Sequence, residues 1–307
     1  MINPGIFNLS FIGLDFEVLT SYSFLVVCLG TMILAIAAGM IGTILVLKGQ
    51  SLIGDAIGHS SYPGVVIAFM IGMALDPVML LIGAIIAGAV AFILIQLTDQ
   101  YSILKLDAIL AIVLSSFFGL GMVLKSYIQG HPVYGQIPQG GLKNYIFGQA
   151  AFIRLIDVRL IIFVAVPSII IFLLFYKEFK VFVFDEEYGR TIGINSRVMY
   201  LLLLIISMGL IATGLKFVGA ILISSFLIVP SITAMQWSNK FHVVLIIAAL
   251  VGCISAFIGT YISSLYAGMS TGPCIILAMS ILAFISMLVG PQGLWGHIRS
   301  RRKHLNA

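Results

Sequence analysis

Residues 51–67 (SLIGDAIGHSSYPGVVI) place a carboxylate and an imidazole inside an otherwise apolar stretch of the chain. Asp55 and His59 are four residues apart, so on a helix both side chains lie on one face, one turn apart. An ionisable side chain at membrane depth is costly and usually marks a functional site. A carboxylate beside an imidazole is a natural pair of ligands for a first-row divalent metal. The spacing therefore favours a metal-ion pathway past this helix.

Glycines and a proline flank this pair. Gly54 and Gly58 permit close backbone approach. Pro63 has no N–H to bond the carbonyl of His59, and a freed carbonyl in a water-lined cavity is a good cation ligand. Pro230, inside a later apolar segment, is a second place for a helix break or gate. A purely structural kink remains an alternative.

Two ligands from one chain are too few for a tight four- or six-coordinate metal site. Asp55 and His59 could hold an ion briefly with water, or four such side chains could meet across a two-fold axis. The alternative is a simple hydrogen bond between the two side chains that stabilises a helix near the cytoplasmic interface. The residue chemistry leaves both interpretations open.

The stretch 177–197 (KEFKVFVFDEEYGRTIGINSR) is the only strongly charged run between apolar segments. Asp185, Glu186 and Glu187 could occupy the first turn of a short helix, where acids interact favourably with the helix dipole. Gly189 and Gly193 permit tight packing or a turn. The composition fits a docking element, and a solvated loop is the alternative.

Sequence motifs for nucleotide binding and hydrolysis are absent. The chain has no GxxxxGK[ST] phosphate loop, no Gly-Lys dipeptide and no HExxH. We therefore expect no enzyme activity, and any ATPase that drives transport must be another polypeptide.

The composition is that of a polytopic all-α membrane protein. Of the 307 residues, 61% are hydrophobic and 9% charged, and a helix needs about 20 apolar residues to cross the membrane. The net charge of +5 fits basic cytoplasmic loops rather than nucleic-acid binding. The nine apolar segments form one membrane domain over residues 1–307 and lie at about 21–47, 56–75, 77–97, 107–125, 157–176, 197–214, 217–236, 241–266 and 272–289.

Lys and Arg predict the orientation. With the N-terminus outside and nine crossings, eleven of the sixteen basic residues lie inside, so we expect a cytoplasmic C-terminus with a basic tail at 298–307. The Gly- and Pro-rich stretch 126–156 contains a short apolar piece, Tyr145 to Ile153, that could be re-entrant. The prediction is about eight to nine transmembrane helices, and ten remain possible.

Small residues recur inside the apolar segments and favour close helix packing. Examples are Gly39 and Gly42 in the first segment and Gly119 and Gly121 in the fourth.

Four blocks of sequence resemble the membrane permease subunits of ABC importers for manganese, zinc and iron. Residues 47–69 (LKGQSLIGDAIGHSSYPGVVIAF) look like the SLMGDALSHAVLPG signature of that family. The other blocks are LKLDAILAIVLSSFFGLGMVL (104–124), FDEEYGRTIGIN (184–195) with VGAILISSFLIVPSITAM (218–235), and STGPCIILAMSILAFISML (270–288).

This resemblance implies a type II ABC importer-like fold in the plasma membrane of a bacterium. Its implied partners are cytoplasmic ABC ATPase subunits, an extracellular or periplasmic metal-binding protein, and a second permease that is either identical or related. Asp55 and His59 match the motif as a transient metal site, without a permanently bound cofactor. The resemblance also implies that an ATPase-coupling segment comprises Asp185, Glu186, Glu187, Gly189, Arg190 and Gly193.

The sequence identifies the family more closely than it identifies the transported metal. Carboxylate plus imidazole suits Mn(II), Fe(II) and Zn(II), and the absence of thiolate gives a mild preference for manganese. Ser60, Ser61 and Tyr62 replace the usual apolar residues after the motif His. The alternative function is a proton- or cation-coupled secondary transporter in which Asp55 and His59 form a relay, and a third is a passive channel.

Overall fold

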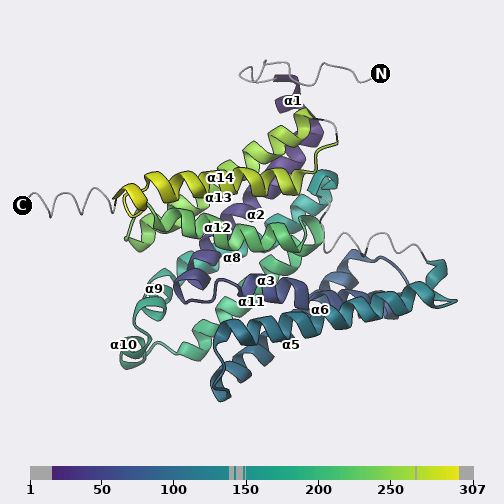
Figure 1. Cartoon of the computed structure of the whole chain (residues 1–307), viewed down its shortest axis with the longest axis horizontal. Coiled ribbons are helices and arrows are strands. Elements are labelled where there is room, and N and C mark those ends of the chain that lie inside the picture. The colour runs from purple at the N-terminus through teal and green to yellow at the C-terminus, as the bar shows by residue number, and fades with distance from the viewer. Residues whose placement is uncertain (1–15, 138–141, 143–147, 149, 267, 297–307) are drawn as a thin grey trace, which may run out of the picture.

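The computed structural model describes residues 16–137, 142, 148, 150–266 and 268–296, and these residues form helices and connecting turns (Figure 1). The helices are α1 (Phe16–Thr20), α2 (Tyr22–Leu47), α3 (Ile53–Ser60), α4 (Tyr62–Gly72), α5 (Pro77–Tyr101), α6 (Leu106–Gly130), α8 (Leu155–Leu174), α9 (Tyr176–Phe184), α10 (Glu186–Thr191), α11 (Ser196–Phe217), α12 (Ala220–Met235), α13 (Phe241–Leu265) and α14 (Thr271–Val289), with short 3₁₀ turns at Tyr134–Gln136 and Ala150–Phe152.

Seven helices in the described ranges are long and apolar enough to cross a membrane, namely α2, α5, α6, α8, α11, α13 and α14. The apolar helix α12 has only 16 residues. The predicted segment 56–75 is divided into α3, with 8 residues, and α4, with 11 residues. The all-helical multi-pass class is confirmed, whereas length alone identifies seven spans rather than eight or nine.

The division between α3 and α4 occurs at Ser61. Pro63 lies in the first turn of α4, where its missing N–H costs little because the first N–H groups of a helix have no intrahelical partner. The same residue cannot continue the hydrogen-bond ladder of α3. Proline therefore separates the helix that carries Asp55 and His59 from the helix that follows.

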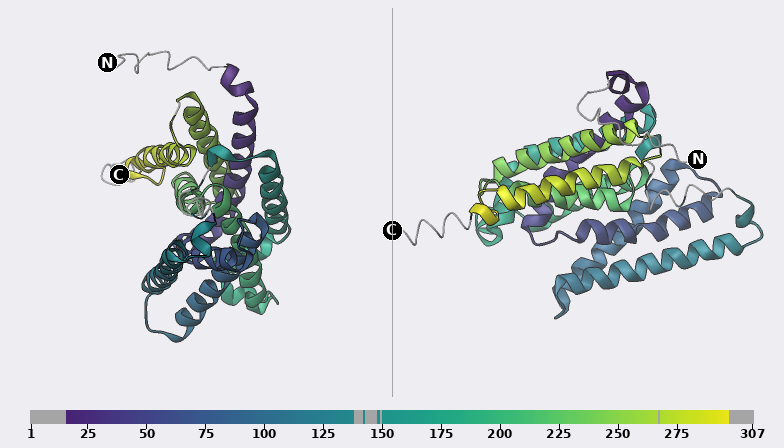
Figure 2. Two further views of the ribbon diagram at one scale, coloured as in Figure 1. Left: turned by 90° about the vertical axis from the view of Figure 1, so that its right-hand side faces the viewer. Right: turned by 45° about the horizontal axis from the view of Figure 1, so that its top comes forward.

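The helices form two groups with α3 between them. Helices α2, α12, α13 and α14 pack together in one group, and α4, α5 and α6 pack together in the other (Figures 1 and 2). Helix α3 contacts α12 from the first group and α5 and α6 from the second, as well as α11. The candidate ligands therefore lie on a helix where the two groups meet.

Small residues bring the helices of the first group close together. A Cβ at Gly42 of α2 would collide with the backbone carbonyl of Leu227 in α12, and one at Gly39 would lie 3.0 Å from the carbonyl oxygen of Ala248 in α13. Gly121 faces Tyr62 and Pro63 in the same way. Gly119, by contrast, faces open space, so the packing role predicted for it is wrong within a single chain.

A tight hydrogen-bonded turn joins α2 to α3. The backbone N–H of Gly49 donates to the carbonyl of Val46 at 3.0 Å, and that of Gln50 donates to the carbonyl of Leu45 at 2.8 Å. Gly49 has a left-handed φ of +71°, so this is the Schellman ending that glycine favours. The N–H of Ile53 then donates to the carbonyl of Gln50. The end of α2 and the start of α3 are therefore fixed to one another.

Two predicted features lie wholly or partly outside the described residues. The basic tail at 298–307 lies wholly outside them, and the possible re-entrant piece at 145–153 is described only at residues 148 and 150–153.

Candidate metal site and coupling segment

Asp55 and His59 face each other across one turn of α3. The Nε2 atom of His59 lies 3.5 Å from Oδ1 of Asp55, and the side chains are 19% and 38% exposed, respectively. The one-turn spacing predicted from the sequence is present. Both groups are accessible at one face of α3, so a small ion could reach a carboxylate oxygen and an imidazole nitrogen together.

One aromatic side chain packs directly against the imidazole. The ring of His59 meets the ring of Phe118 in α6 edge to face, with centroids 5.2 Å apart. Tyr62 also contacts Phe118, with centroids 6.2 Å apart. These contacts restrict the orientation of His59 and place apolar surface beside the polar pair.

Two hydroxyl groups near this pair are buried and have no hydrogen-bond partner in the described structure: those of Ser60 and Tyr62. Both belong to the tripeptide that departs from the family signature. A buried hydroxyl usually bonds to protein or ordered water. The α3–α4 junction therefore has two buried hydroxyl groups that could still form hydrogen bonds near the candidate ligands.

One chain does not complete a metal site. Among the described residues, no group of three or more His, Cys, Asp or Glu side chains could hold a metal ion. Asp55 and His59 supply two ligands, fewer than the four to six that divalent metals take. The remaining positions are available to water or to side chains of another protein molecule.

The two prolines proposed as breaks have different positions. Pro63 follows the junction at Ser61, whereas α12 continues through the buried Pro230. Pro230 removes one backbone hydrogen bond from the middle of α12 without ending the helix.

The charged segment forms two short helices, α9 and α10. Asp185 caps α10, because its Oδ1 accepts from the backbone N–H of Tyr188 at 2.9 Å, and Glu186 and Glu187 lie in the first turn. Gly189 is buried against Val181, and Gly193 has a φ of +89°. The acidic first turn and the glycine turn predicted from the sequence are both present.

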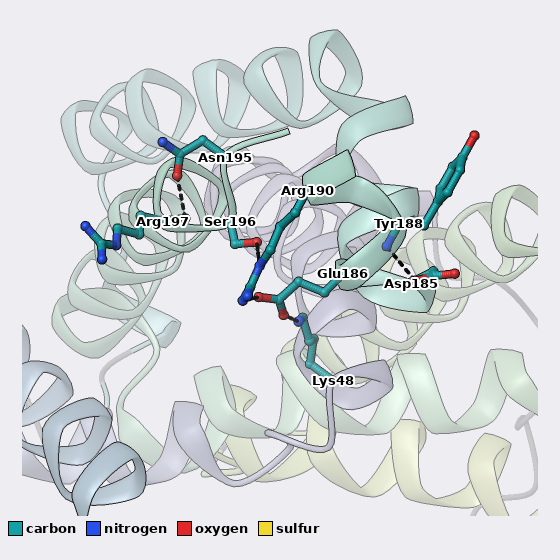
Figure 3. A network of polar contacts seen from close by, with 8 residues as sticks. All are labelled: Lys48, Asp185, Glu186, Tyr188, Arg190, Asn195, Ser196 and Arg197. Carbon is teal, nitrogen blue, oxygen red and sulfur yellow. Dashed lines mark hydrogen bonds and ion pairs between the residues drawn. The ribbon is translucent and has the colours of Figure 1, made fainter. Parts of the chain in front are cut away.

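Glu186 is the centre of a charged network (Figure 3). Its carboxylate accepts from Nζ of Lys48 at 2.9 Å and from Nη2 of Arg190 at 2.8 Å. Nε of Arg190 in turn donates to Oγ of Ser196, the first residue of α11, at 3.2 Å. Burial opposes ionisation of Glu186, but hydrogen bonds from Lys48 and Arg190 outweigh it and lower the pKa of the carboxyl group.

The outer face of this segment is apolar as well as charged. Phe184 at the end of α9, Tyr188 in α10 and Ile192 just after α10 are more than half exposed. Glu187 is exposed beside them. A short helix with exposed aromatic and charged side chains has the composition of a contact surface.

Lys48 belongs to this network but was not among the coupling residues predicted from the sequence. Its Nζ lies 3.7 Å from the ring centroid of Phe182 and 5.1 Å from that of Tyr200, a cation–π arrangement. Its partner Glu186 is 138 positions away in the sequence. The only sequence signal was the position of Lys48 within the block that resembles the family signature.

Comparison with known proteins places these features in a family. The model of a protein family described as "ABC 3 transport family" matches residues 21–290 of this chain. The manganese transport system membrane protein MntC of Bacillus subtilis is 38% identical over 86% of this chain, which spans 60% of that relative. The zinc transport system membrane protein TroC of Treponema pallidum is 35% identical, covering 89% of this chain and 91% of TroC.

A solved structure gives the same result. PsaBC from Streptococcus pneumoniae in complex with Fab superposes with a TM-score of 0.78 at 26% identity, covering 92% of this chain and 97% of that chain. The sequence match over most of the chain and the shared helical fold agree. This multi-pass membrane protein belongs to the ABC 3 transport family.

Proposed function

We propose that this chain is the transmembrane permease of an ATP-driven importer that moves a divalent transition-metal ion into the cytoplasm of a bacterium. The observation that carries the proposal is the Asp55–His59 pair on one face of α3, where the two helix groups meet. Family membership supports an ATP-driven transporter, and relatives named for manganese and zinc transport support a metal cargo.

Asp55 and His59 hold the ion transiently in this proposal. Water and the same two side chains of a second permease, identical or related, supply the remaining ligands. Manganese is our preferred cargo over zinc and iron, because the pair offers a hard carboxylate oxygen and lacks thiolate. Pro63 and Pro230 are proposed to allow the helix adjustments that open and close the path.

The energy for transport comes from separate ATPase subunits that contact α10 from the cytoplasm. The exposed residues Phe184, Tyr188 and Glu187 support this docking surface. The residues proposed for the ATPase-coupling segment are Asp185, Glu186, Glu187, Gly189, Arg190 and Gly193. An extracellular or periplasmic binding protein delivers the ion on the opposite side, and alternating access moves it across.

Of the eight to nine crossings predicted, the proposed topology takes nine, because an odd number is needed to leave the N-terminus outside and the C-terminus in the cytoplasm. It is supported by two separate charge groups. Lys48, Glu186 and Arg190 meet at the ends assigned to the cytoplasm, whereas Asp157 and Lys216 meet at ends assigned to the outside. Helix α12 and the divided α3–α4 segment supply the crossings beyond seven.

Reconstitution into proteoliposomes with the partner ATPase and binding protein tests this function. We expect metal uptake that requires ATP and persists when ionophores collapse the proton and sodium gradients. Uptake that needs a gradient and proceeds without ATP would contradict the importer and favour the secondary transporter, in which Asp55 and His59 relay protons.

A further inference from the structure

Lys48 connects the candidate coupling helix to the helix that carries the candidate metal ligands. Among the described elements, α10 packs chiefly against α9 and α11. The Lys48–Glu186 ion pair adds a direct side-chain link from α10 to the end of α2 (Figure 3). Helix α2 in turn leads into α3 within five residues.

The environment of Lys48 makes this link specific. Its side chain is 12% exposed, and the ammonium group lies over the rings of Phe182 and Tyr200 while it donates to Glu186. An exposed ion pair contributes little and is easily exchanged for water. A mostly buried ammonium with one carboxylate partner is costly to separate from that partner, so Lys48 and Glu186 are expected to move together.

The backbone after Lys48 leads to α3 through a hydrogen-bonded turn. Lys48 caps α2, and the Schellman turn at Gly49 and Gln50 fixes it to the start of α3. Gln50 is buried, and Asp55 lies seven residues beyond Lys48. The connection from Lys48 to α3 is therefore a short hydrogen-bonded turn rather than an unbonded loop.

We propose that Lys48 is a positioning residue for transport: its ion pair with Glu186 transmits movement of α10 through the α2–α3 turn to Asp55 and His59. This inference rests on the proposed importer function and adds a specific mechanical connection to it. Arg190 holds Glu186 from its other side and joins it to Ser196 of α11, so the carboxylate moves with α10.

The test uses the complex of permease, ATPase and binding protein in proteoliposomes. Lys48→Met removes the ammonium group and keeps an unbranched side chain. Lys48→Met leaves the Glu186 carboxylate without one of its two charged partners. The second variant, Lys48→Met/Glu186→Gln, therefore also removes that charge, and the amide oxygen of the new glutamine can still accept from Arg190. Lys216→Met is the matched control, since Lys216 is 13% exposed and forms another ion pair, with Asp157 at 3.7 Å.

Three quantities are measured for each variant: co-purification with the ATPase, metal affinity in the absence of ATP, and metal ions transported per ATP hydrolysed. We expect both Lys48 variants to co-purify and to bind metal like the wild type. Metal transported per ATP should fall about ten-fold, within the usual range of coupling between distant sites. Lys216→Met should retain the wild-type ratio.

Three results would overturn the proposal. These are a wild-type transport ratio in the double variant, an equal loss in Lys216→Met, and failure of both Lys48 variants to bind the ATPase. The last would make the ion pair part of the docking surface. Absence of ATP-dependent uptake in the wild type would instead contradict the proposed function itself.

Discussion

At the residue scale, the proposed ion-binding pair, Asp55 and His59, supplies fewer ligands than a closed metal site. Their facing atoms are 3.5 Å apart, and both side chains are partly accessible. A transport site must bind its ion and also release it, so two ligands supplemented by water suit transport better than a closed four-ligand cage. The ring of Phe118 beside His59 holds the imidazole in place without adding a ligand.

Asp55→Asn is expected to weaken manganese binding to the purified permease by about ten- to 100-fold. The change keeps the side-chain size and removes the charged oxygen that a hard cation prefers. Mutation of a residue that only supports a metal ligand already lowers metal affinity about ten- to 100-fold. Isothermal titration calorimetry measures the affinity, with Asp99→Asn as the control carboxylate. Equal affinities for wild type and Asp55→Asn would remove Asp55 from the site.

The sequence was sufficient to pair Asp55 with His59, because helical spacing brings residues four apart together. It could not pair Lys48 with Glu186, which are 138 positions apart and meet only through the tertiary arrangement of α2 and α10. Local periodicity carries no information about such a contact. The cation–π contacts of Lys48 were unpredictable for the same reason.

At the element scale, backbone proximity decides which glycines matter. Gly42→Ala should destabilise the protein by about 1–3 kcal/mol, because a methyl group there collides with the backbone of Leu227. Gly119→Ala should stabilise it by about 0.5–1 kcal/mol, since alanine is the better helix former and the site is open. Thermal unfolding in detergent measures both changes. Effects of the same sign would contradict the observed α2–α12 packing.

The ionisation of Glu186 gives the α10 contact a defined pH dependence. Its pKa is lowered in the folded protein, so its contribution to stability is full above the ordinary glutamate value of about 4.3 and is lost as pH falls through the lower folded value. The difference in thermal stability between wild type and Glu186→Gln should therefore be constant from about pH 7 to 5 and shrink below about pH 4.3. A difference that shrinks between pH 7 and 6 would contradict the Lys48 and Arg190 contacts.

At the scale of the whole molecule, an incomplete site on a partly exposed face of α3 calls for a second permease. Expressed without a related permease, the chain should form a homodimer. Light scattering in detergent should give a protein mass of about twice the 33.2 kDa of one chain. A mass of one chain would contradict the homodimer and leave a related permease or water to complete the ligand set.

Hydropathy predicted the all-helical class and the approximate spans, since about 20 apolar residues are needed for each crossing. It did not distinguish a full crossing from a shorter or divided one. The predicted segment 56–75 becomes α3 and α4, and α12 has only 16 residues. The packing of α3 between two helix groups depends on side-chain fit and cannot be read from hydropathy.

The most direct test of the central claim is ATP-dependent uptake of Mn(II), Zn(II) and Fe(II) into proteoliposomes that contain the permease, its ATPase and its binding protein. Wild type and the Asp55→Ala/His59→Ala variant are compared in proteoliposomes that contain equal amounts of the assembled complex. We predict uptake of at least one of these metals, with manganese favoured, and its loss in the double variant. Uptake by the double variant at the wild-type rate would contradict the assignment of Asp55 and His59 as the transport site.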